Sequence, residues 1–127
     1  MKFIIDRRKW RRGGNDSRLT FRYGETYLLN EQGNMCCLGQ ICKQLDIPDE
    51  YILGVNHPHQ INPAAENYSS LINILLRQSV AKTCYLNTEL AYKAVCINDD
   101  PFIHSDLREQ QLTELFKKYD HEIEFIN

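Results

Sequence analysis

The stretch that most constrains the fold is Asn30 to Leu45, which joins a turn directly to an amphipathic helix. Its first residues include asparagines and a glycine, which favour turns. Apolar residues then recur at spacings of three and four, which places them on one face of a helix. These residues are Leu38, Ile41, Cys42 and Leu45. Because Gly39 lies inside this helix at a propensity cost of about 1 kcal/mol, we expect another backbone to pack closely against it.

Two β-rich runs lie near the ends of the chain, at residues 2–6 and 122–126. The first contains Phe3-Ile4-Ile5, and the second alternates polar and apolar side chains. A further strand is predicted at 26–29. Helices are predicted at 36–45, 51–53, 68–80, 87–98 and 105–118, the third capped by Asn67 or Ser69 and the last by Ser105-Asp106. We therefore expect an α+β fold in which a small antiparallel sheet, with N- and C-terminal strands, packs against three to five helices.

The length of 127 residues fits one domain, and we expect residues 1–127 to form a single ligand-binding domain. With 43% hydrophobic residues, the chain can bury an ordinary core. No apolar run is long enough to cross a bilayer, and no signal peptide is recognisable. We expect a cytoplasmic protein that does not bind membranes.

Five cysteines and four histidines are candidates for thiol or metal chemistry. The odd cysteine count without an export signal favours reduced, buried thiols over disulfides. No cysteine pair has the two-residue gap that zinc sites favour, so we expect no metal. Cys36 and Cys37 begin a predicted helix, where the helix dipole could lower a thiol pKa. Because no supporting base can be identified, packing is the favoured role of this pair.

Positive charge is concentrated near the N-terminus. Residues 1–22 hold eight basic and two acidic residues, whereas residues 23–127 hold seven basic and fifteen acidic ones. This asymmetry fits a local anion site, or attraction between the two parts within a fold or an oligomer, rather than a surface that coats duplex nucleic acid. Trp10 lies among the arginines and could stack on a base, but the favoured interpretation is an anchor in the core.

No nucleophile elbow, phosphate-binding loop or paired metal-ligand motif is present, so we expect neither an enzyme nor a cofactor. One further cluster runs from Asn98 to Arg108. Its carboxylates and amides could bind ribose and base edges, Phe102 could stack, and Arg108 could hold a phosphate. From the residues alone, an ordinary turn with solvated acids is favoured.

Three segments form a recognisable pattern. Residues 3–11 read Phe-Ile-Ile-Asp-Arg-Arg-Lys-Trp-Arg, residues 28–39 end in Met-Cys-Cys-Leu-Gly, and residues 97–100 read Ile-Asn-Asp-Asp before a helix and a final strand. This pattern resembles a family of small phage proteins with a Cys-Cys-Leu-Gly motif, and most closely the first-described Thoeris anti-defence sponges. Those proteins sequester cyclic ADP-ribose isomers made by bacterial TIR-domain enzymes, and some also bind cyclic oligonucleotides. The resemblance covers about residues 2–53 and 85–126.

The resemblance implies a phage anti-defence protein that sequesters glycocyclic ADP-ribose or a related cyclic nucleotide in the host cytoplasm without cleaving it. It also implies a homo-oligomer built from dimers, up to a hexamer, with ligand pockets at subunit interfaces. Carried over by position, the ligand contacts are Asn98, Asp100, Phe102, Arg108 and Tyr92. The family pattern has a second arginine one helical turn after the first, where this chain has Leu112. Candidates for the missing phosphate contact are Arg8, Arg11, Arg12 and Lys117.

Two other functions stay open. A phage-encoded inhibitor could bind a host protein through the acidic body of the chain or the irregular stretch at 54–67. An enzyme could degrade or modify a nucleotide. We rank the sponge first, the inhibitor second and the enzyme third.

Overall fold

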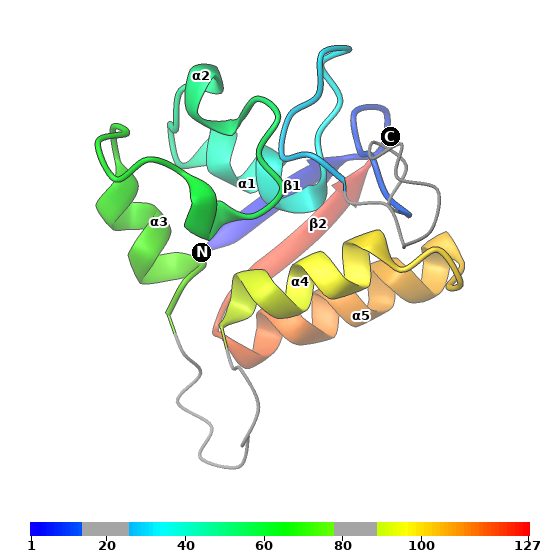
Figure 1. Cartoon of the computed structure of the whole chain (residues 1–127). Coiled ribbons are helices and arrows are strands. Elements are labelled where there is room, and N and C mark those ends of the chain that lie inside the picture. Colours follow the sequence, from blue (N-terminus) through cyan, green and yellow to red (C-terminus); the bar gives the residue numbers. More distant parts are fainter. Residues whose placement is uncertain (14–25, 78–88) are drawn as a thin grey trace.

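The computed structural model describes residues 1–13, 26–77 and 89–127. It is an α+β fold in which the described helices pack against a two-stranded sheet. In the view of Figure 1, α1 and α2 lie above the strands, α3 lies to their left, and the α4–α5 hairpin lies below them. The elements in chain order are β1 (Lys2–Asp6), α1 (Cys37–Gln44), α2 (Asp49–Ile52), the 3-10 helix η1 (Pro58–Gln60), α3 (Tyr68–Ile74), α4 (Leu90–Asp99), α5 (Ser105–Lys118) and β2 (Glu122–Ile126).

The sheet is parallel, so the predicted antiparallel sheet is wrong. The strands β1 and β2 pair from Lys2 opposite Glu122 to Asp6 opposite Ile126. Alternation of polar and apolar residues predicts which face each side chain takes, but it carries no information about strand direction. No hairpin joins these strands, and the turn after α5, where Asp120 has a left-handed φ of 63°, directs β2 parallel to β1.

The strand predicted at residues 26–29 is also absent. Leu28 is fully buried, and Leu29 forms one isolated bridge with Leu53. The Leu28 N–H donates to the Val55 carbonyl at 2.7 Å, and the Gly54 N–H donates to the Leu29 carbonyl at 2.9 Å. The apolar run is therefore a buried connecting segment, because burial alone cannot distinguish such a segment from a strand.

Helix α1 forms as predicted, and its glycine has the predicted role. A Cβ added at Gly39 would lie 1.7 Å from the Leu28 carbonyl oxygen. Cys36 Sγ accepts a hydrogen bond from the Gly39 N–H at 3.4 Å and so caps the helix. Cys36, Cys37 and Cys42 are buried, and burial raises the pKa of the Cys37 and Cys42 thiols. These thiols are structural, as expected.

Two glutamines of α1 occupy the outer edge of β1. The Ile4 N–H donates to Gln44 Oε1 at 2.9 Å, and Gln44 Nε2 donates back to the Ile4 carbonyl at 2.7 Å. Gln40 makes the same pair of bonds with Asp6, at 2.8 and 3.2 Å. The two side-chain amides thus replace a neighbouring strand along this edge, because each supplies one acceptor and one donor.

Several helix ends differ from the prediction. Helix α3 ends at Ile74 rather than continuing to Val80, which lies outside the described residues. At its start, Asn67 occupies the N-cap position with φ 60°, but its side chain makes no capping bond. Helix α5 begins at Ser105 itself, so the N-cap residue is His104.

Aromatic side chains from distant segments meet in the core. Phe3 of β1 packs edge-on against Phe116 of α5, with ring centroids 6.2 Å apart. Trp10 is 6% exposed and lies 5.0 Å from the ring of Phe125, so the anchor interpretation of this tryptophan is confirmed. Within the described residues, no helix is long and apolar enough to cross a membrane.

Candidate functional site

Asn98, at the end of α4, is the centre of an internal hydrogen-bond network. It is 1% exposed, and its Oδ1 accepts from Trp10 Nε1 at 2.7 Å and from the Cys37 N–H at 3.1 Å. Its Nδ2 donates to the Arg11 carbonyl at 3.2 Å and to Asp99 Oδ1 at 2.9 Å. This amide joins the N-terminal segment, the start of α1 and the end of α4. It is therefore committed to internal contacts rather than presented to solvent.

Arg108 is also buried, at 4% exposure. Its Nε donates to the Ile97 carbonyl at 3.2 Å, and its Nη2 donates to the carbonyls of Asp100 and, at 3.2 Å, of Ile103. A helix leaves its last carbonyls without intrahelical partners, and a guanidinium can satisfy several of them. Burial, followed by the nearby charge of Arg12, lowers the pKa of this guanidinium. Arg108 thus clamps the loop between α4 and α5.

Other predicted residues surround this loop. Asp100 Oδ1 accepts from the Phe102 N–H at 2.9 Å, and the Phe102 side chain is 77% exposed. The Arg12 guanidinium lies 4.5 Å from the centroid of the Trp10 ring, and its Nε donates to Ser105 Oγ at 3.2 Å. One corner of the molecule therefore gathers most of the predicted ligand contacts. They are Asn98, Asp100, Phe102, Arg108 and Arg12.

Arg11 reaches this corner through its carbonyl, which accepts from Asn98 Nδ2, whereas the other predicted contacts lie elsewhere. Arg8 forms an ion pair with Asp6 of β1, at 2.9 Å. Lys117 is exposed in the last turn of α5. Tyr92 is 49% exposed and lies about 9 Å along the α4 axis from the corner, at 1.5 Å per residue. Tyr92 therefore lies at a different level of α4 from the corner around Asn98.

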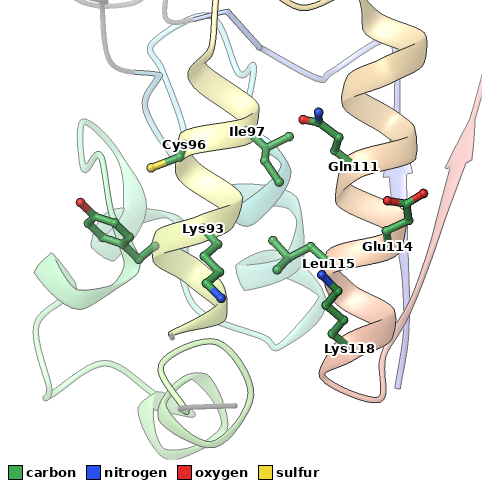
Figure 2. Close-up of a pocket in the computed structure, with 8 residues that line it drawn as sticks. Lys93, Cys96, Ile97, Gln111, Glu114, Leu115 and Lys118 are labelled. Carbon is green, nitrogen blue, oxygen red and sulfur yellow. The ribbon is translucent and has the colours of Figure 1, made fainter. Parts of the chain in front are cut away.

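Tyr92 instead lines a groove of about 660 Å³ between α4 and α5. The groove is lined by Tyr92, Lys93, Cys96 and Ile97 of α4 and by Gln111, Glu114, Leu115 and Lys118 of α5. Figure 2 shows Ile97 and Leu115 between the two helices, with the amino groups of Lys93 and Lys118 directed into the space beside Leu115. The groove thus combines an apolar floor with two cations supplied by opposite walls.

The thiol that lines the groove is that of Cys96. Partial burial, followed by the charge of Asp99, raises the pKa of the exposed Cys96 thiol. A raised pKa keeps the thiol protonated and poorly nucleophilic at neutral pH. Among the described residues that line the groove, none is a histidine and one, Glu114, is a carboxylate. Across the described residues, no group of three or more His, Cys, Asp or Glu side chains is arranged to hold a metal ion.

Most groove residues were missed from the sequence, although a signal was present. Tyr92 and Lys117 were predicted as ligand contacts, but Lys93 and Lys118 were not. Lys93 and Ile97 are four residues apart on α4. On α5, spacings of three and four residues separate Gln111, Glu114 and Lys118. Because the connection of five residues makes α4 and α5 neighbours, these two stripes could have been predicted to form one surface.

The chain matches no protein-family model, no curated protein and no solved structure. The resemblance to phage anti-defence sponges therefore stays a prediction.

Proposed function

We propose that this protein binds a cyclic nucleotide signal, of the cyclic ADP-ribose type, and sequesters it without converting it. The observation that carries the proposal is the α4–α5 groove, which is lined by the exposed Tyr92, the apolar Ile97 and Leu115, and two lysines. A nucleotide presents the complementary groups, namely a flat base, ribose hydroxyls and phosphates. The volume of about 660 Å³ falls within the range of small-molecule sites.

Each groove residue has a role in this proposal. Tyr92 stacks on the base, an interaction worth about 1–3 kcal/mol per base in proteins that bind single strands. Lys93 and Lys118 approach the phosphates from opposite helices. The Gln111 amide donates and accepts hydrogen bonds at ribose hydroxyls or base edges, and the Glu114 carboxylate accepts them.

Asn98 and Arg108 act in this proposal as positioning residues. Arg108 joins α5 to the carbonyl of Ile97, whose side chain lines the groove. Asn98 fixes the same end of α4 to Trp10 and α1. Together they set the position of α4 relative to α5, which determines the width of the groove.

Sequestration rather than turnover is supported by the chemistry of the lining. The raised pKa keeps the thiol of Cys96 protonated, and Glu114 is the one carboxylate among the described lining residues. A sponge needs affinity without reaction, so such a lining is sufficient.

Titration calorimetry with cyclic ADP-ribose isomers and cyclic trinucleotides tests the proposal. We expect binding to at least one of them, with the ligand released chemically unchanged on heat denaturation. Lys118→Met should weaken binding about 10- to 150-fold, since a charge-assisted contact contributes about 1.5–3 kcal/mol. Lys117→Met is the matched control, because Lys117 is exposed on the same turn and does not line the groove.

Absence of binding to every one of these nucleotides would refute the proposal. Equal loss of affinity in the Lys117→Met and Lys118→Met proteins would contradict the assignment of the groove. Recovery of a cleaved ligand would favour an enzyme instead. A stoichiometric host protein recovered without nucleotide would favour the protein-binding inhibitor.

A further inference from the structure

The two outer edges of the sheet differ in how their backbone groups are paired. The edge of β1 is capped by Gln40 and Gln44 through four hydrogen bonds of 2.7–3.2 Å. On β2 no described side chain plays this part. The Glu122 N–H donates to the Met1 carbonyl at 2.9 Å, and the Arg7 N–H donates to the Ile126 carbonyl at 2.9 Å.

These bonds fix the orientation of β2. Since Glu122 and Ile126 direct their backbone groups toward β1, the alternation of a strand directs those of Ile123 and Phe125 to the outer edge. In residues 1–13, 26–77 and 89–127, no backbone or side-chain group is hydrogen-bonded to the N–H or carbonyl of either residue. An unpaired edge of this kind is a template for another strand.

We propose that this edge of β2 pairs with β2 of a second copy of the chain, antiparallel and about a twofold axis at Glu124. Among the described residues, each chain has one capped edge and one open edge. Pairing the two open edges gives the outward N–H and carbonyl groups of both copies hydrogen-bond partners at once. The product is a four-stranded sheet whose two outer edges are both capped by glutamines. The assembly therefore closes at two copies, as an isologous interface requires.

The side chains fit this register. With Glu124 on the axis, Ile123 lies opposite Phe125 of the second copy, and each of the two equivalent pairs exchanges two backbone hydrogen bonds. These apolar side chains meet on the face of the sheet that carries the core residues Phe3 and Ile5. On the other face the two Glu124 carboxylates meet, and each is offset by Lys2 of its own chain at 2.5 Å.

This interface uses different elements from the nucleotide groove, so the two proposals stand or fall separately. Cysteine cross-linking tests the register. Opposite residues at a non-hydrogen-bonded position have Cβ atoms about 4.5–5.5 Å apart, close to disulfide geometry. Glu124→Cys should therefore cross-link across the axis under mild oxidation. Two copies of Glu122→Cys would lie about 14 Å apart along the strands, so that variant is the matched control.

Both variants are made with Cys84→Ser and Cys96→Ser. Among the described cysteines, Cys96 is exposed, whereas Cys36, Cys37 and Cys42 are buried. We expect a covalent dimer from Glu124→Cys and monomers from Glu122→Cys on a denaturing gel. For the unmodified protein, we expect light scattering to give twice the chain mass at high micromolar concentration.

Hydrogen exchange on the unmodified protein provides a test that does not depend on a variant folding. The Ile123 and Phe125 amides should become protected as the protein concentration rises. A chain that stays monomeric at every concentration would overturn the proposal. Equal cross-linking of both variants would also overturn it, because it would indicate another register or another surface. A dimer in which the Ile123 and Phe125 amides still exchange rapidly would overturn it as well, because the dimer would then use another surface.

Discussion

Replacing Gly39 by alanine should destabilise the protein, although alanine is the better helix former. In an open helix the change from glycine would stabilise by about 1 kcal/mol. Here the new Cβ would lie 1.7 Å from the Leu28 carbonyl oxygen and 2.6 Å from its carbon. Both are backbone atoms, so no side-chain rotation can relieve the contact. The two segments would have to separate by at least 1.3 Å for the shortest contact to reach 3.0 Å.

Leu28 cannot move freely, because it is fully buried and its N–H is bonded to the Val55 carbonyl at 2.7 Å. Overpacking of a core typically costs about 1–3 kcal/mol, and loss of a buried hydrogen bond adds about 1 kcal/mol or more. After the gain in helix propensity is subtracted, we expect a net loss of about 1–3 kcal/mol.

Urea unfolding monitored by the fluorescence of Trp10, the single tryptophan, measures this loss. Gly33→Ala is the control, because Gly33 has open space around it and only its left-handed φ of 83° opposes a side chain. That strain should cost about 1–2 kcal/mol. If Gly39→Ala is as stable as the unmodified protein, or more stable than Gly33→Ala, the close-approach argument is wrong.

Two further predictions concern buried polar side chains. Asn98→Ala leaves the Trp10 Nε1–H and the Cys37 N–H without their acceptor. We therefore expect the free energy of unfolding, measured in urea, to fall by about 2–5 kcal/mol. A fall below about 1 kcal/mol would contradict the network. Burial, followed by His59, lowers the pKa of His57 from 6.5 to about 4. As the pH falls, the unfolded state therefore binds a proton at a higher pH than the folded state does. The free energy of unfolding should be greatest above pH 6.5 and should fall by about 2–3 kcal/mol between pH 6.5 and 4. His57→Gln should reduce that slope in urea titrations at several pH values, and an unchanged slope would exclude His57 as its source.

The local features of the chain could be predicted because their causes are local. The α1 corner depends on a turn, a helical apolar stripe and Gly39, all within Asn30 to Leu45. The direction of β2 could not be predicted, since residues 122–126 carry the same alternation in either orientation.

The site depends on contacts that no local pattern contains. Asn98 lies in an Asn-Asp-Asp-Pro sequence that is typical of a solvated turn. Its burial follows from Trp10, 88 residues away, and from Cys37, 61 residues away. Arg108 was predicted to hold a phosphate because its guanidinium has forked donors, and three backbone carbonyls use those donors instead.

The pairing of β1 with β2 sets the order in which the chain can complete its fold. Lys2 is made 120 residues before its partner Glu122. At 5–20 residues per second, β1 waits on the order of ten seconds for its neighbouring strand. During that time Gln40 and Gln44 of α1 can already hold the outer edge of β1, so the nascent strand is kept in an extended form on a helix. The final event is then the docking of β2 onto a prepared edge, which makes the last residues of the sheet decisive for completing the fold.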